Sequence, residues 1–299
     1  MNYNKIYEDF NKRFGHEKEY AYFVGKPIEF FSCRGITAGC CVSVGGTIVL
    51  SRRNDGRIIV QFSDNDDFIN CSKTELENNK DKKICRFFLE AEKYGVNIGG
   101  AEILLHYTSE ISHQYRQLLM SAMPSFCANV PQKRELAALF DDYGENILAA
   151  YARENTLSVI RGGDVNYLPF SDNAVKVILC YAECGGKYEL TGNAKIAETA
   201  LSALSDGDYE KFGAALNRYT DGLTKKENCS RSARRLHEIS MRTDGAYGSG
   251  LTSDGGIFAV ADNARVDFYM RRVSEEYRKF FGSAPKFYVT RSESSGVLG

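Results

Sequence analysis

The apolar and polar positions of the first 62 residues predict one helix followed by four strands. The apolar residues of the helix recur at helical spacing and would share one face: Tyr3, Tyr7, Phe10 and Phe14. Extended segments rich in apolar and β-branched residues follow at 21–24, 28–31, 40–50 and 57–62. The sequence Asn54-Asp55-Gly56 before the last of them is typical of a hairpin turn.

Helices and single strands follow one another through the rest of the chain. Helical spacing of apolar residues occurs at 84–91, 112–123, 133–140, 145–153, 192–205, 208–223, 230–242 and 265–281. Strands are predicted at 101–106, 157–160, 175–180, 257–260 and 286–290. Because these elements do not form a regular βαβ series, the pattern indicates an α+β protein.

Residues 245–256 read GAYGSGLTSDGG and lead directly into the apolar strand predicted at 257–260. Glycine allows positive φ and close approach of the backbone to another group, but it also adds conformational entropy to the unfolded chain. Five glycines in twelve residues therefore indicate that the backbone here adopts positive φ or approaches another group closely. The segment is either a tight turn between a helix and a strand or a backbone that surrounds a ligand, and a glycine-rich motif alone does not decide between them.

Composition narrows the class of protein. The chain of 299 residues has 38 basic and 39 acidic side chains, so no overall charge favours nucleic acid or an anionic membrane as a partner. Its apolar runs fall short of the roughly 20 residues that a membrane span needs, and its first residues lack the pattern of a secretory signal. We therefore expect a cytoplasmic protein. The nine cysteines form no CxxC pair and the four histidines no HExxH motif, so we predict free thiols and no metal site.

Three stretches occur in an order that resembles a known family. Residues 7–17 read YEDFNKRFGHE, residues 203–217 read ALSDGDYEKFGAALN, and residues 245–256 keep glycines at both ends. Together they resemble the galactokinase branch of the GHMP small-molecule kinases along almost the whole chain. The resemblance implies a two-lobed kinase fold with lobes at 1–172 and 173–299, and it places the glycine segment 248–256 in the cleft between them.

The sugar-binding motif of that family, GR-[IV]-NLIGEHTDYNGG, corresponds here to residues 26–39, KPIEFFSCRGITAG. Pro27 occupies the position of the family's arginine, while Cys33 and Arg34 occupy those of its glutamate and histidine, and the apolar positions are kept. By resemblance, Glu29 and Arg34 are the candidate substrate-binding residues of this segment, with Glu29 standing near the lost carboxylate.

The family's phosphate-binding loop is replaced as well. After the strand at 101–106 no glycine occurs until Gly144, and Glu110 adds a negative charge where phosphates would lie. Arg116 or His113 could compensate for that charge. The resemblance then leaves Ser249, Gly250, Gly255 and Gly256 as the nucleotide-binding candidates. We predict weak affinity for Mg-ATP.

Glu145 and Asn146 stand where the family motif GIMDQ has its catalytic aspartate and the following glutamine. The resemblance implies that Glu145 is the catalytic carboxylate and that Asn146 contacts the substrate. The alternative is that Glu145 is a helix-start residue stabilised by the helix dipole.

Three hypotheses follow. The chain is an ATP- and Mg-dependent sugar kinase with an altered site, a non-catalytic homologue that senses a ligand or binds a partner, or an unrelated α+β binding protein. Phosphoryl transfer depends on positioning and charge stabilisation, which the family's motifs supply. Because those motifs are altered here, this dependence weighs against full activity. The sequence identifies neither the sugar, the oligomeric state nor any protein partner.

Overall fold

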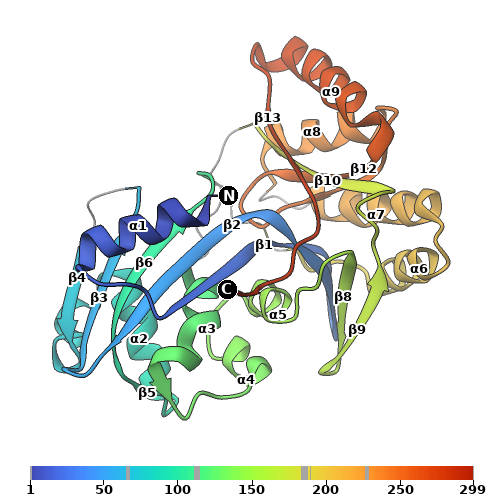
Figure 1. Ribbon diagram of the computed structural model, residues 1–299. Helices are drawn as coiled ribbons and strands as arrows, with labels where there is room; N and C mark the ends of the chain where they lie inside the picture. Colours follow the sequence, from blue (N-terminus) through green and yellow to red (C-terminus); the bar gives the residue numbers. More distant parts are fainter. Residues whose placement is uncertain are drawn as a thin grey trace. The chain divides into compact units, whose positions relative to one another are not determined.

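The structure, a computed structural model, describes residues 2–64, 68–110, 115–182, 188, 190–225 and 229–298. The chain divides into two compact units. Unit 1 comprises Met1–Lys26, Val44–Ala150 and Ser294–Gly299, and unit 2 comprises Pro27–Ser43 and Tyr151–Glu293. Both units are discontinuous in sequence, unlike the contiguous lobes 1–172 and 173–299, which stay a prediction. Figure 1 colours the elements in chain order.

Unit 1 combines a mixed sheet with helices. Its helices are α1 (Tyr3–Phe14), α2 (Lys83–Lys93), α3 (Tyr115–Phe126), α4 (Lys133–Ala138) and α5 (Tyr143–Ala150), with short 3-10 turns η1 (Lys73–Glu75) and η2 (Glu77–Asn79). Its own strands are β3 (Arg57–Phe62), β4 (Phe68–Ser72), β5 (Asn97–Ile98), β6 (Gly100–Tyr107), β7 (Cys127–Ala128) and β14 (Gly296–Val297). The long strands β1 (Tyr20–Cys33) and β2 (Ile36–Arg53) contribute residues to both units.

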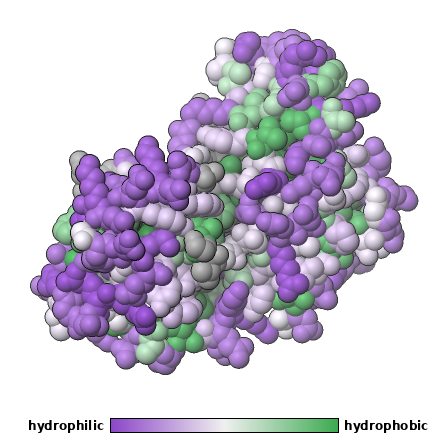
Figure 2. All heavy atoms as spheres, viewed as in Figure 1, coloured by the Kyte–Doolittle hydropathy of each residue, from purple (hydrophilic) through white to green (hydrophobic). Residues whose placement is uncertain are grey.

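The sheet of unit 1 has the order β14-β1-β2-β6-β3-β4, in which β3 and β6 are parallel. Helix α1 covers one face, where Ile6 and Phe10 pack against Ala21, Val49 and Leu104 (Figure 1). The predicted stripe of aromatic residues thus faces the sheet, while the outer side of α1 is hydrophilic (Figure 2). Burial of this stripe, more than helix propensity, stabilises the helix.

Unit 2 contains a four-stranded antiparallel sheet, a hairpin and four long helices. The sheet has the order β11 (Ala246–Leu251), β12 (Ile257–Asp262), β10 (Val175–Tyr181) and β13 (Lys286–Thr290). The hairpin β8 (Thr156–Arg161) and β9 (Asp164–Pro169) pairs with Ile36–Gly39 of β2. The helices are α6 (Ala194–Ser205), α7 (Tyr209–Thr224), α8 (Arg231–Met241) and α9 (Val266–Phe281), with the 3-10 turn η3 (Asn263–Arg265) before α9.

The glycine segment is mostly a strand, not a loop. Residues Ala246–Leu251 form β11, and only the residues after it turn back, closed by the Thr252 N–H donating to the Gly256 carbonyl at 3.0 Å. Helix α7 lies so close to β11 that a Cβ at Gly213 would stand 2.0 Å from the carbonyl oxygen of Tyr247. A Cβ at Gly248 would stand 2.5 Å from the carbonyl oxygen of Gly213. These two glycines therefore allow α7 and β11 to pack closely. In the sequence, only the high glycine content of the segment pointed to such a requirement.

Other predicted elements differ from the observed ones in their bounds. The helix predicted at 112–123 is observed as α3, and residues 111–114 lie outside the described part of the chain. The helix predicted at 145–153 begins two residues earlier, as α5, and ends at Ala150. Strands β4 and β9 were not predicted. Strand β4 has only five residues, of which Ile69 and Cys71 are buried, and β9 buries none of its six, so neither provides the apolar run on which the prediction rested.

Candidate functional site

Glu145 lies in the first turn of α5 and is half-buried. A carboxylate at this position is favoured by the partial positive charge of the helix N-terminus. Just before the helix, Asp142 has a φ of 65° and accepts a hydrogen bond from Arg116 at 3.2 Å, and Arg116 also lies 3.8 Å from Asp141. Arg116 is thus paired with two carboxylates of unit 1. Both interpretations of Glu145, catalytic and helix-stabilising, fit this geometry.

Asn146 is buried and holds three elements of unit 1 together. Its Oδ1 accepts a hydrogen bond from Gln117 Nε2 at 2.8 Å, which connects α5 to α3. Its Nδ2 donates to the carbonyl oxygens of Asp141 at 2.9 Å and Ala137 at 3.3 Å. Asn146 therefore orients the helix that carries Glu145, and contact with a substrate stays a prediction for it.

Glu29 and Arg34 lie in unit 2, near the turn between β1 and β2. Arg34 is exposed beside Gly35, whose φ is 82°, and it has no ion-pair partner in the part of the chain that the structure describes. Glu29 is half-buried, and its neighbour Phe30 stacks on Phe258 of β12 with ring centroids 4.4 Å apart. Glu29 thus borders the aromatic core of unit 2, whereas Arg34 lies exposed at the turn.

Tyr219 of α7 fixes this segment of β1 through its hydroxyl. The hydroxyl accepts from the N–H of Ser32 at 2.9 Å, and its oxygen lies within hydrogen-bond reach of the carbonyls of Ser32 and Leu190. Burial raises the pKa of Tyr219, and the charge of Glu29 adds to the rise. The hydroxyl therefore stays neutral and can both donate and accept.

We expect Tyr219→Phe to lower the free energy of unfolding by about 2 kcal/mol, because it removes the hydroxyl that accepts from the Ser32 N–H and lies 2.9 Å from the Leu190 carbonyl oxygen. Urea unfolding measures this change. The matched control is Tyr94→Phe, since Tyr94 is 59% exposed and should change stability by less than about 0.5 kcal/mol. Equal stability of the two variants would contradict the role given to the Tyr219 hydroxyl.

The predicted nucleotide-binding residues are engaged inside unit 2. Ser249 is fully buried, and its N–H donates to Asn217 Oδ1 at 2.8 Å. The N–H of Gly256 donates to Thr252 Oγ1 at 2.9 Å, and that of Gly255 lies 3.3 Å from the Thr252 carbonyl oxygen. Gly250 leaves room for the ring of Phe258, which a Cβ would meet at 2.3 Å. The backbone amides of Ser249, Gly255 and Gly256 thus have partners within the unit, and Gly250 pairs with Phe258 in the ladder of β11 and β12.

A buried polar network around His237 surrounds Ser249. The Ser249 hydroxyl and His237 Nδ1 are 2.7 Å apart, and His237 Nε2 is 3.4 Å from Asp221 Oδ1. Desolvation lowers the pKa of His237, against the opposing effect of Asp221. This network was not predicted from the sequence, although His237 lies four residues after Ala233 and three before Ser240, both buried, and so shares the inward face of α8 with them.

His237 should make the protein less stable in mild acid. The folded state keeps the imidazole neutral, whereas the unfolded chain binds a proton below about pH 6.5, so the free energy of unfolding falls as the pH drops below that value. We expect His237→Gln to reduce this dependence in urea unfolding between pH 5 and 7.5. His16→Gln should have the opposite effect, because hydrogen bonds to Glu17 and Glu102 raise the pKa of His16. An unchanged pH dependence in His237→Gln would contradict the assignment.

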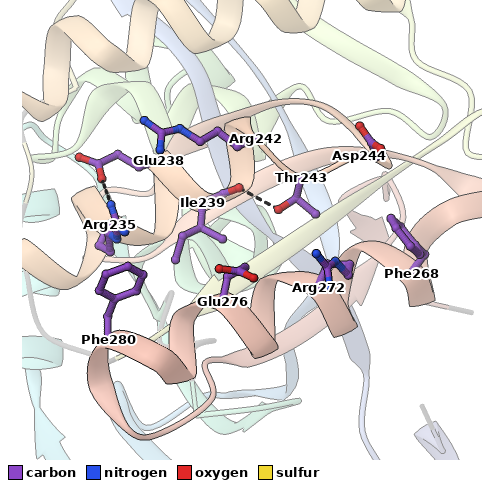
Figure 3. Close-up of a pocket in the computed structure, with 10 residues that line it drawn as sticks. All are labelled: Arg235, Glu238, Ile239, Arg242, Thr243, Asp244, Phe268, Arg272, Glu276 and Phe280. Atoms are coloured by element: carbon purple, nitrogen blue, oxygen red, sulfur yellow. Dashed lines mark hydrogen bonds and ion pairs between the residues drawn. The ribbon is translucent and has the colours of Figure 1, made fainter.

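A pocket of about 330 Å³ lies between α8 and α9 (Figure 3). Its charged side chains balance, three arginines against three carboxylates: Arg235, Arg242, Arg272, Glu238, Asp244 and Glu276. Arg235 stacks over Phe280 at 3.7 Å and donates to Glu238 at 2.7 Å. Arg235 is therefore partly packed and not simply part of a solvated helix face. The surface around α8, α9 and β13 includes an apolar area (Figure 2), and the exposed large apolar side chains of these elements are Phe268, Phe280, Phe281 and Val289.

Among the described residues, the cysteines and potential metal ligands form no further site. The eight described cysteines are free thiols, and all but Cys127 are buried, as the sequence predicted. The described residues include no group of three or more potential metal ligands. Within the same residues, no helix is long and apolar enough to cross a membrane.

Comparison with known proteins defines the fold. No protein-family model and no curated protein sequence matches the chain. Among solved structures, the galactokinase of Lactococcus lactis, complexed with galactose, superposes with a TM-score of 0.84 at 15% identity and covers 100% of both chains. The mevalonate kinase of Methanococcus jannaschii has a TM-score of 0.64 at 13% identity, covering 92% of this chain and 98% of that one. Mevalonate diphosphate decarboxylase from Staphylococcus aureus has a TM-score of 0.63 at 9% identity, and the match covers 94% of this chain and 97% of the decarboxylase chain.

The chain therefore has the α+β fold of the GHMP kinases, as the sequence resemblance predicted. Within that fold its structure is galactokinase-like along its whole length. At 15% identity the likeness defines the fold, and function has to be argued from the residues.

Proposed function

We propose that the protein is a galactokinase-like, ATP-dependent phosphotransferase that acts slowly on a galactose-type sugar. The observation that carries this proposal is the match over 100% of both chains to a galactokinase solved with galactose. The carboxylate of Glu145 at the start of α5 supports it further, because this reaction needs a group that can orient or deprotonate a sugar hydroxyl.

The other proposed roles follow the sequence resemblance. Glu29, Arg34 and Asn146 would contact the sugar, and Ser249, Gly250, Gly255 and Gly256 would border the nucleotide. Arg34 is the candidate to offset phosphoryl charge, because Pro27 occupies the position of the family's arginine. Losing a preorganised stabiliser of that charge typically costs on the order of 100-fold or more in rate, so we expect slow turnover.

Magnesium would accompany the nucleotide. Mg²⁺ in such sites keeps several waters and takes only one or two protein carboxylates, so it needs no dedicated cluster of ligands. Asp254, in the turn between β11 and β12, is a fitting candidate, and its carboxylate accepts a hydrogen bond from the Tyr181 hydroxyl at 3.0 Å. Magnesium would supply positive charge that offsets the charge of the phosphates.

The second candidate function is a non-catalytic homologue that senses a ligand or binds a partner. The engaged amides of Ser249, Gly255 and Gly256 favour it, since backbone amides that already have partners within the unit are not free to hold phosphates. The three hydrogen bonds of Asn146 favour it as well. A cytoplasmic location remains a prediction under either function.

Thermal shift and calorimetry distinguish the slow kinase from the non-catalytic homologue. Galactose alone, Mg-ATP alone and both together are titrated, because a ligand that binds only the folded state raises its melting temperature with concentration. For a slow kinase we expect a shift with galactose and weak Mg-ATP binding, with little heat at micromolar concentrations. Sub-micromolar affinity for Mg-ATP would contradict the proposed phosphate site. A shift with galactose but no ADP release would favour the sensor.

A further inference from the structure

A second pocket, of about 210 Å³, lies within unit 1 between α3, α4 and α5. Its inner residues are buried and mostly apolar, with Met120, Leu136 and Ala149 each at most 5% exposed. Pro124 and Lys133, which also line it, are exposed. This gradient of burial gives the pocket an apolar interior and a mouth that carries a positive charge.

Polar groups in the lining are poorly satisfied. Pro124 lies inside α3 and has no N–H, so the carbonyl of Met120 lacks the helical donor four residues later. The hydroxyl of Ser295 is buried and has no hydrogen-bond partner among the described residues. A buried polar group without a partner costs free energy that a bound ligand can recover.

The size of the pocket limits what it can hold. An apolar cavity of about 150 Å³ in another protein accommodates one benzene molecule. A pocket of about 210 Å³ therefore accommodates an aromatic ring or short aliphatic chain with a small polar group attached. The charge of Lys133 at the mouth favours an anionic group there, and Lys133 already donates to the Ala150 carbonyl at 3.1 Å, which holds its amine beside the end of α5.

We propose that this pocket binds a small monocarboxylate of about ten non-hydrogen atoms in all, its carboxylate paired with Lys133 and its apolar body against Met120, Leu136 and Ala149. Such a site is additional to the proposed sugar and nucleotide site, with which it shares only Asn146 among the residues named for both. Gln117 and Asn146 also line the pocket and are hydrogen-bonded to each other, so an occupant would contact the residues that orient α5.

The test uses two probes of the same shape, phenylacetate and its neutral counterpart phenylacetamide, in calorimetric titrations without sugar or nucleotide. We expect the wild-type protein to bind phenylacetate with a Kd on the order of 1 mM, and phenylacetamide more weakly. Lys133→Gln should weaken phenylacetate binding about 5-fold and leave phenylacetamide binding unchanged. Lys93→Gln is the matched control and should change neither, because Lys93 is also an exposed lysine of unit 1 and lies outside the pocket.

Ser121→Phe places a ring in the pocket from a half-buried position of α3 and should abolish binding of both probes. Circular dichroism confirms that each variant is folded. Three outcomes overturn the proposal: no phenylacetate binding by the wild type up to about 10 mM, equal phenylacetate affinity in Lys133→Gln and Lys93→Gln, or unchanged binding in folded Ser121→Phe. Because no titration contains sugar or nucleotide, the result is independent of whether the protein is a kinase.

Discussion

Glu145→Gln should lower the rate of galactose-dependent ADP release by about 100-fold or more, if the protein transfers phosphate. A positioned general base typically contributes that much, and glutamine keeps the shape of the side chain while removing its ability to take a proton. The measurement is ADP release by purified protein under saturating sugar and Mg-ATP. Equal, measurable rates in both proteins would rule out a catalytic role for Glu145.

Stability measurements separate the two interpretations of Glu145. If the carboxylate serves only the N-terminus of α5, Glu145→Gln should cost about 0.3–1 kcal/mol of stability and leave the rate of the folded protein unchanged. Glu77→Gln is the control for loss of one negative charge in unit 1, because the Glu77 side chain is 66% exposed and its ion pair is with the exposed Lys80. Absence of turnover in the wild type as well would favour the sensor function.

Gly213→Ala should be the most destabilising single-methyl substitution in unit 2 that we can identify. The added Cβ would stand 2.0 Å from the Tyr247 carbonyl oxygen and 2.2 Å from its carbon, so α7 and β11 would have to separate. Overpacking usually costs about 1–3 kcal/mol, and we expect the upper end or more because backbone atoms cannot rotate away. Thermal unfolding should show a loss of roughly 6–12 °C.

The same helix supplies the control. Gly222 also lies in α7, but nothing is within 4 Å of a Cβ built there. Gly222→Ala should therefore raise stability by about 0.5–1 kcal/mol, since alanine favours the helix and restricts the unfolded chain. If Gly213→Ala were as stable as Gly222→Ala, the close contact of α7 with β11 would be wrong.

The fold was largely predictable because its helices bury regular apolar stripes. The spacing of Tyr3, Tyr7, Phe10 and Phe14 in α1 is local information and needs no knowledge of what the helix covers. Strand β11 was missed because its glycines provide no alternation of apolar and polar residues. Their purpose, close packing of Gly248 against Gly213, depends on a contact between residues 35 positions apart in the sequence.

The candidate site was predictable in part, and only through family resemblance. The position of Glu145 at a helix start agrees with its sequence context. The network of His237, Ser249 and Asn217 was not predicted, because it joins α8, β11 and α7 through side chains that are distant in sequence. The assignment of Pro27–Ser43 to unit 2 was not predictable from composition either. Strand β1 runs unbroken across the boundary at Pro27, and β2 runs unbroken across the boundary at Ser43.

Strand β14 has a consequence for synthesis on the ribosome. It pairs with β1 through Tyr22 and Phe23, and the N–H of Leu298 donates to the carbonyl of Ala21 at 2.8 Å. In the chain it follows the whole of Tyr151–Glu293 of unit 2. A nascent chain that has emerged only as far as Ala150 therefore contains the helices of unit 1 but leaves the edge of its sheet uncovered. Such an edge is open to pairing with other chains, so early fragments of this protein should be substrates for chaperones until residues 296–298 arrive.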